Sequence, residues 1–153
     1  METSQFNPDT FLNATMNAPL EKRSPIPEGD YTGVFGRPEV RVVDGKKDPT
    51  KVYTFVDIPV TVEIPADIQS NLGLQPTLRL SYSFGLDMNS TGGLDTTRGR
   101  NNGLRVLREA LDLNKAGDNF SLAAVEGRPI LVKVKHELYQ DTIQERVKGI
   151  AKL

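Results

Sequence analysis

Hydrophobic and polar residues alternate most regularly over residues 128–153. Apolar residues occupy the even positions from 130 to 138, interrupted only by His136, while lysines, a glutamate and a tyrosine occupy the odd positions from 133 to 139. A period of two is typical of a half-buried β-strand. The alternation resumes after the polar turn Gln140-Asp141 and breaks at Gly149, where a bulge or bend is expected. This pattern predicts two paired strands with one apolar side and one basic, partly aromatic side.

Three further strands are predicted upstream, over residues 30–43, 51–64 and 77–86. The clearest is the second, in which every valine and isoleucine has an even number, while Lys51 and two aromatic residues have odd numbers. Glycines interrupt the first strand, as expected where a small barrel bends sharply. Asp44-Gly45 is a turn signal between the first two strands.

One amphipathic helix is predicted over residues 103–113, because its leucines and Ala110 follow the helical i, i+3, i+4, i+7 spacing. Asn101 or Asn102 is the expected N-cap. A further helical turn is expected at residues 66–71. We therefore expect an all-β fold with one main helix, in which strands and helix follow each other in the order of a five-stranded OB-fold barrel, β-β-β-α-β-β. A strand-rich α+β sandwich is the competing architecture.

The chain is predicted to contain one domain, residues 28–153, preceded by an N-terminal arm, residues 1–27. The arm is polar, rich in Asn and Pro, and lacks a clear period. Its phenylalanines, Phe6 and Phe11, are expected to pin it onto the core, with docking on a second copy or a partner as the alternative. A chain of 153 residues is long enough for one proper core.

The charge distribution is uneven, although the net charge is only −1. Residues 1–97 carry a net charge of −5 and residues 98–153 a net charge of +4, which hints at a basic surface on one part of the fold. The absence of Cys excludes disulfides, cysteine-ligated zinc and thiol catalysis. No apolar run approaches the ~20 residues of a membrane helix, and the N-terminus does not resemble a signal peptide. A cytoplasmic protein is expected.

Catalytic chemistry has little support in the sequence. His136, the only histidine, occupies an apolar strand position, which favours a packed, hydrogen-bonded role over a catalytic one. Neither a phosphate-binding loop nor a dinucleotide-binding glycine fingerprint is present. The spacing of Asp44, Asp48 and Asp57 matches no calcium loop. We therefore expect no enzymatic activity, no metal site and no cofactor.

Several short motifs follow one another along most of the chain. They are Asn7-Pro8-Asp9 in the arm, Pro27-Glu28-Gly29-Asp30-Tyr31 at the start of the first strand, Gly127-Arg128-Pro129-Ile130 at the start of the fourth and Val147-Lys148-Gly149 in the last. With the leucine-rich helix between them, these motifs resemble a family of small phage proteins regarded as single-stranded DNA-binding (SSB-like) proteins with an OB-fold. The resemblance implies that the chain binds single-stranded DNA in phage replication or recombination, in the cytoplasm of the host cell.

Single-strand binding requires cations that follow the phosphates and flat side chains that stack on unpaired bases. The candidates are Lys46, Lys47, Lys51, Tyr53, Phe55, Arg79, Arg98, Arg100, Lys133, Lys135 and Tyr139, with Tyr31, Phe35, Arg146 and Lys148 in addition. We expect the odd-numbered face of the second strand to share a surface with Lys133, Lys135 and Tyr139. The polar loop 87–102, read as exposed and flexible, would close over it.

The expected partners are single-stranded DNA and, through it, replication or recombination proteins, and the sequence leaves a homodimer open. Many SSB proteins end in a mobile acidic tail that recruits such proteins, whereas residues 148–153 are basic and apolar, so recruitment by a tail is not expected. The alternative is a non-enzymatic structural or adaptor protein, either a virion component or a protein–protein interaction module.

Overall fold

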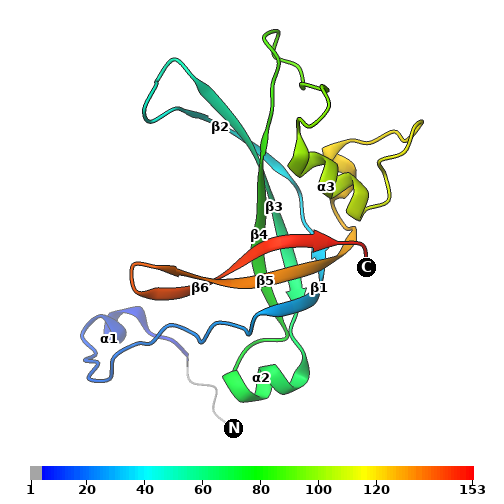
Figure 1. The fold of residues 1–153 in the computed structure, drawn as a ribbon. Coiled ribbons are helices and arrows are strands. Elements are labelled where there is room, and N and C mark those ends of the chain that lie inside the picture. The colour runs from blue at the N-terminus through cyan, green and yellow to red at the C-terminus, as the bar shows by residue number, and fades with distance from the viewer. Residues whose placement is uncertain (1–4) are drawn as a thin grey trace.

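The computed structural model describes residues 5–153, which form an antiparallel sheet with a few short helices (Figure 1). The first four residues of the expected arm lie outside this range. The strands are β1 (Gly29–Phe35), β2 (Glu39–Asp44), β3 (Val52–Glu63), β4 (Thr77–Leu86), β5 (Pro129–Tyr139) and β6 (Thr142–Ala151). The helices are α1 (Pro8–Leu12), α2 (Ala66–Leu72), α3 (Asn102–Ala110) and the 3-10 helix η1 (Leu122–Val125).

The stretch predicted as one bent first strand forms two strands, β1 and β2. Both pair with β3, as the Cα partners Phe35↔Val60 and Glu39↔Asp57 show. Between them the backbone N–H of Gly36 donates to the Pro59 carbonyl at 2.7 Å. A Cβ atom on Gly36 would lie 2.8 Å from Cγ of Pro59, so the close approach at this bend requires glycine. The sheet therefore has six strands rather than five.

The strands are ordered β4-β3-β1-β5-β6, with β2 beside the first half of β3. The β5–β6 hairpin crosses β3 and β4 at a steep angle (Figure 1), and Cα atoms of β4 and β6 approach within 8 Å. In residues 5–153, however, no ladder joins β4 to β6. The sheet is therefore open, and the closed five-stranded barrel expected from the element order is not seen.

In β3, β4 and β5 the core is formed by even-numbered residues, as the sequence predicts. The even-numbered residues of β3 from Val56 to Val62 are buried, together with Ile64 just after this strand and even-numbered residues of β4 and β5. Helix α3 covers this layer with Leu107 and Ala110. A Cβ atom on Gly103 would lie 2.6 Å from Cβ of Phe84, so the first turn of the helix packs directly on β4.

The β5–β6 hairpin also follows the prediction. Gln140 and Asp141 have φ angles of 47° and 61°, the left-handed conformation that a two-residue hairpin turn requires. The register shifts where Lys133 faces Gly149, so the expected bulge is confirmed. None of the helices in the described range is long and apolar enough to span a membrane.

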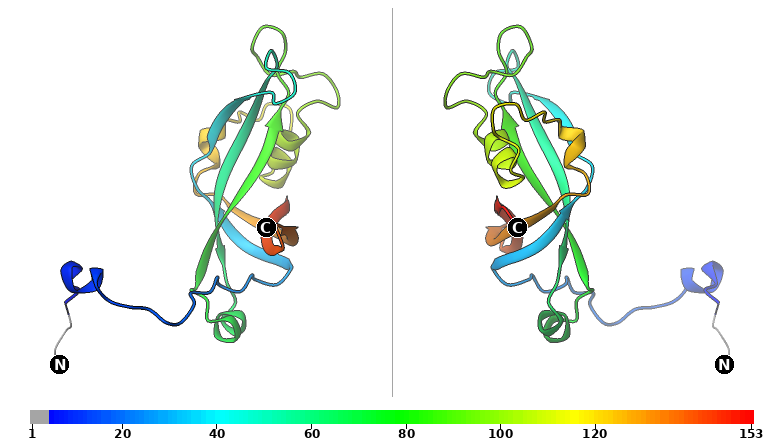
Figure 2. Two further views of the ribbon diagram at one scale, coloured as in Figure 1. Left: turned by 90° about the vertical axis from the view of Figure 1, so that its left-hand side faces the viewer. Right: turned by 90° about the vertical axis from the view of Figure 1, so that its right-hand side faces the viewer.

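The N-terminal arm is not attached by its phenylalanines, contrary to expectation. Phe6 and Phe11 are 70% and 52% exposed, and their rings lie against each other with centroids 5.2 Å apart. Helix α1 stands well away from the sheet (Figure 2). The attachment is made instead by Ile26, which is completely buried, and by the Tyr31 hydroxyl, which donates to the Pro27 carbonyl at 2.6 Å.

Polar contacts with the β5–β6 hairpin complete this attachment. Arg23 donates two hydrogen bonds to the Glu145 carboxylate, which also accepts the Ile26 backbone N–H at 3.2 Å. The backbone N–H of His136 donates to Glu28 at 2.8 Å, and its ring Nε2 lies 2.7 Å from the Ile26 carbonyl oxygen. Residues 23–27 of the arm are thus held against the sheet by specific contacts. His136 is hydrogen-bonded as predicted, but it is exposed rather than packed in the core.

The Glu145 contacts predict an acid-dependent stability. Burial alone would raise the pKa of Glu145, but the hydrogen bonds from Arg23 and Ile26 outweigh burial and lower that pKa. Since the folded pKa lies below the unfolded one, this stabilisation is complete above the ordinary pKa of glutamate and is lost as the pH falls through the folded value. We expect Glu145→Gln to cost about 1–2 kcal/mol of unfolding free energy at pH 7 and less in acid, measured by urea denaturation. The exposed Glu63→Gln is the control. If Glu145→Gln lost the same unfolding free energy at pH 7 and in acid, the assignment of this stabilisation to the Glu145 carboxylate would be contradicted.

Candidate nucleic-acid interface

The candidate site is the outer face of β2, β3 and β4, opposite the core. Odd-numbered residues of these strands lie on this face, and the register places them in rows across it. The rows are Val43–Tyr53, Arg41–Phe55–Gly85, Glu39–Asp57–Ser83, Pro59–Ser81 and Thr61–Arg79. Aromatic rings therefore lie toward the β2–β3 loop, and Arg79 lies toward the α2 end.

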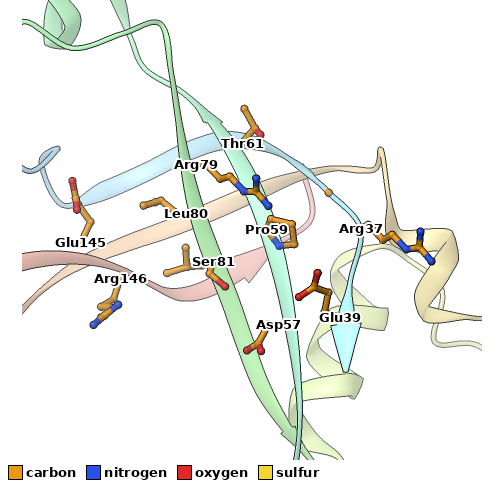
Figure 3. A pocket seen from close by; sticks show the side chains of 12 residues that line it. Arg37, Glu39, Asp57, Pro59, Thr61, Arg79, Leu80, Ser81, Glu145 and Arg146 are labelled. Atoms are coloured by element: carbon orange, nitrogen blue, oxygen red, sulfur yellow. The ribbon is translucent and has the colours of Figure 1, made fainter. Parts of the chain in front are cut away.

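A groove of about 770 Å³ crosses this face from the β1–β2 bend to β6 (Figure 3). Arg37 and Glu39 line one end and Glu145, Arg146 and Val147 the other. Its middle is lined by Asp57, Pro59, Thr61, Arg79, Leu80 and Ser81. The groove is thus made by segments that are distant in sequence, which the strand order brings together.

The groove contains as many arginines as carboxylates, but most of the carboxylates are already paired. Asp57 is bound by Arg41, and Glu145 is bound by Arg23. In contrast, Arg37 and Arg79 form no ion pair with any residue in the range 5–153. The groove therefore offers two uncommitted guanidinium groups to an anion, which planar guanidinium can bind through two parallel hydrogen bonds.

Arg41, Asp57 and Ser83 form a hydrogen-bonded group on the same face. Arg41 Nε donates to Asp57 at 2.9 Å and the Ser83 hydroxyl donates to it at 2.7 Å. These two bonds hold the pKa of Asp57 below its ordinary value. The same pair positions the Arg41 guanidinium over the Phe55 ring, 4.9 Å from its centroid. One face of Phe55 is therefore covered, and Tyr53, 49% exposed, is the accessible ring.

The loop between β2 and β3 places three lysines beside Tyr53. Asp48 accepts hydrogen bonds from the Thr50 backbone N–H at 3.1 Å and from the Thr50 hydroxyl at 2.5 Å. The backbone N–H of Gly45 donates to the Lys51 carbonyl at 2.8 Å, so the loop folds back on itself. Lys46, Lys47 and Lys51 are all exposed and, like Arg37 and Arg79, have no ion-pair partner among the described residues.

The structure does not place the β5 candidates in this groove. Lys133 lies opposite Asp30 of β1 and Gly149 of β6, so β1 separates it from β3. Lys135 lies opposite Arg146, one strand beyond the end of the groove. Tyr139 is at the tip of the β5–β6 hairpin. The expected single surface that joins these residues to Tyr53 is therefore not formed.

Arg98 and Arg100 lie on a different part of the molecule. The buried Asn101 side chain bonds to the backbone of Asp87 and Asp95, and this ties loop 87–102 down at both ends. The two arginines line a separate hollow of about 380 Å³ beside α3. The loop is exposed, as expected, but its arginines line the hollow beside α3 and do not lie over the groove.

Two of the predicted stacking residues are buried, and two arginines on the outer face were not predicted from the sequence. Tyr31 and Phe35 are buried in the main core, so neither ring is available to a ligand. Arg41 was missed, although the alternation with the valines on either side marks it as outward-facing. Arg37 was also missed, and because it lies in the bend between β1 and β2, no periodic signal identifies it.

Comparison with models of known protein families and with curated proteins gives no match for this sequence. The function is therefore inferred from the geometry of this face.

Proposed function

We propose that the protein binds single-stranded DNA, without strong sequence preference, along the groove on the outer face of β3 and β4. The observation that carries this proposal is the combination of uncommitted cations and an exposed ring on one face. Arg37 and Arg79 lie in the groove, and Tyr53 lies on the same face beside the lysine-bearing loop. Cations of this kind follow the phosphates, while a base stacked on an aromatic ring contributes on the order of 1–3 kcal/mol.

The strand order supports reading the sheet as an OB-fold whose barrel is open between β4 and β6. The long bent β1–β2 segment, β3 and β4 correspond to the first three strands, α3 follows, and β5 and β6 return beside β1. In OB-folds, the second and third strands and the loop between the first two form the usual oligonucleotide-binding surface. Those elements are β3, β4 and loop 45–51 in this chain, the elements on which the cations and Tyr53 lie.

The chemistry of the face favours a single strand over a duplex. A base can stack on Tyr53 only if its face is free, which excludes the paired, stacked bases of a duplex. Glu39 and Asp57 also keep the groove from being uniformly basic, which disfavours tight binding of the denser charge of duplex DNA. From the motif resemblance we place this activity in phage replication or recombination, as a non-enzymatic binding protein.

Tyrosine fluorescence tests the proposed stacking directly. The chain has four tyrosines and no tryptophan, and only Tyr53 and Tyr139 are substantially exposed. We expect oligo-dT to quench the fluorescence of the protein, because a base stacked on Tyr53 quenches its emission. Tyr53→Phe should remove most of this quenching while preserving binding, and the matched variant Tyr139→Phe should leave it unchanged. Full quenching in Tyr53→Phe would show that the DNA lies elsewhere.

A structural or adaptor role remains the second candidate. The exposed apolar residues on α1 and around it, Phe6, Phe11, Leu12 and Met16, are the observation that favours protein–protein contact. Oligo-dT binding distinguishes the two, since an apolar docking site has no affinity for phosphates and no steep dependence on salt.

A further inference from the structure

The arm carries an apolar segment that nothing else in residues 5–153 covers. Phe6, Phe11, Leu12 and Met16 are all more than half exposed. They lie on and around α1, a helix of five residues whose N-cap, Asn7, accepts hydrogen bonds from the backbone N–H groups of Asp9 and Thr10 at 3.0 and 3.3 Å. Isolated helices shorter than about 12 residues are marginal in water. A surface that covers its apolar side would stabilise this helix.

A second uncovered apolar surface lies on the inner side of the β2–β3 hairpin. Val40, Val42 and Val52 share the face of the sheet that elsewhere forms the core, yet each is more than half exposed. Thr54, opposite Val42, links this face to Leu86 of β4. These four apolar residues, Val40, Val42, Val52 and Leu86, form what we call the valine strip. Leu86 is partly buried against the core, so the strip adjoins the core layer.

The geometry disfavours an arrangement in which the arm covers the valine strip of its own chain. Arg23 lines a hollow with Ile64 and Thr77, so the arm leaves the sheet at the C-terminal end of β3, whereas the strip is at the N-terminal end. β3 has 12 residues, which span about 40 Å at ~3.3 Å per residue. The 12 residue steps from Arg23 to Phe11 reach at most about 40–43 Å when fully extended, and α1 shortens that reach. Figure 1 shows α1 at the end of the molecule opposite the tip of the β2–β3 hairpin.

We propose that α1 of one copy docks on the valine strip of a second copy, and that the exchange is reciprocal. Both surfaces belong to the same chain, so two copies satisfy both of them with closed two-fold symmetry. Phe6 and Phe11, 70% and 52% exposed, can bury roughly 200–300 Å² per arm. Two arms with their receiving surfaces therefore remove on the order of 800–1,200 Å² from water, to which Leu12 and Met16 add, and this reaches the roughly 1,000 Å² of a specific interface. The groove on the outer face stays free.

Solution mass tests the exchange. Sedimentation velocity of the full chain at micromolar concentration should give a dimer, with twice the mass of the 16.9 kDa chain. Phe11→Asp and Val42→Asp should each give a monomer with unchanged circular dichroism. Leu138→Asp, at the exposed tip of the β5–β6 hairpin, should remain a dimer. A monomeric unmodified chain, or a dimer that withstands both Phe11→Asp and Val42→Asp, would overturn the proposal.

Engineered cysteines test which surfaces meet, since the chain contains no cysteine. Thr10 is in α1, and Asp44 lies opposite Val52 beside the valine strip. Mixing a Thr10→Cys chain with an Asp44→Cys chain under oxidising conditions should give a disulfide-linked dimer in high yield. A mixture of Thr10→Cys with Ser70→Cys, an exposed position on α2, should give little. Equal yields from the two mixtures would exclude docking at the strip.

Discussion

Replacing Arg37 and Arg79 together with glutamate is expected to lower the affinity for oligo-dT by roughly 10- to 100-fold at low salt. Both arginines line the groove, Arg37 at its end, and neither has an ion-pair partner in the described chain, so both are free to contact phosphates. Each lost contact with single-stranded DNA lowers the slope of log affinity against log salt by about 0.7. The double variant should therefore show a slope shallower by about 1.4, measured by fluorescence anisotropy at several salt concentrations.

A second double variant, with the same change in net charge but outside the groove, shows how much of the lost affinity comes from groove contacts and how much from the net charge of the protein. Lys22→Glu with Lys133→Glu changes the charge by the same amount, but neither residue lines the groove. We expect its affinity for oligo-dT to change by less than about 3-fold at moderate salt, where distant charges are screened. Equal losses in the two double variants would show that net charge, and not this groove, governs binding.

Ile26→Ala is expected to cost about 2–4 kcal/mol of unfolding free energy. The Ile26 side chain is completely buried, and its backbone is held by Glu145 and His136. The substitution removes apolar contacts and leaves a cavity under the segment that attaches the arm to the sheet. Urea denaturation followed by circular dichroism measures the change.

The matched control for this substitution is Leu20→Ala, six residues earlier in the same arm. Leu20 is 92% exposed, so its truncation should leave the unfolding free energy within about 0.5 kcal/mol of the original. If both variants unfold at the same urea concentration, Ile26 does not stabilise the core.

Local pattern was sufficient to predict most of the secondary structure. The period of two in residues 51–64 and 128–139 marks the buried face of β3 from Val56 onward and of β5 up to Val134, because a strand with one buried face must place alternate side chains in the core. Val52 and Leu138 have the same parity but are exposed, because no other element of the described chain covers those strand ends. The short helix α2 and the turn at Gln140 were also predicted, since each depends on neighbouring residues alone.

Features that depend on distant contacts were not predictable. The split between β1 and β2 depends on the approach of Gly36 to Pro59, which no local signal reveals. The anchoring of the arm depends on Glu145, more than a hundred residues away in sequence. The phenylalanines of the arm were assigned to the core because of their hydrophobicity, but hydrophobicity does not specify which surface covers a side chain.

The candidate site was only partly predictable, because side-chain parity can be read from the sequence but strand order cannot. Parity alone placed Tyr53, Phe55 and Arg79 on the outer face, and it also placed Lys133 and Lys135 on an outer face. Parity cannot specify which outward faces adjoin, because that depends on strand order. The order places β1 between β3 and β5, and this separates the two sets of cations.

The affinity of the unmodified protein for single-stranded DNA tests the central claim most directly. Labelled oligo-dT and a duplex of equal length are titrated with the full chain, and fluorescence anisotropy is recorded at low and moderate salt. We predict binding of oligo-dT at micromolar protein or below, weaker binding of the duplex, and a steep loss of affinity as salt rises. An anisotropy that stays flat with oligo-dT at micromolar protein and low salt would contradict the account.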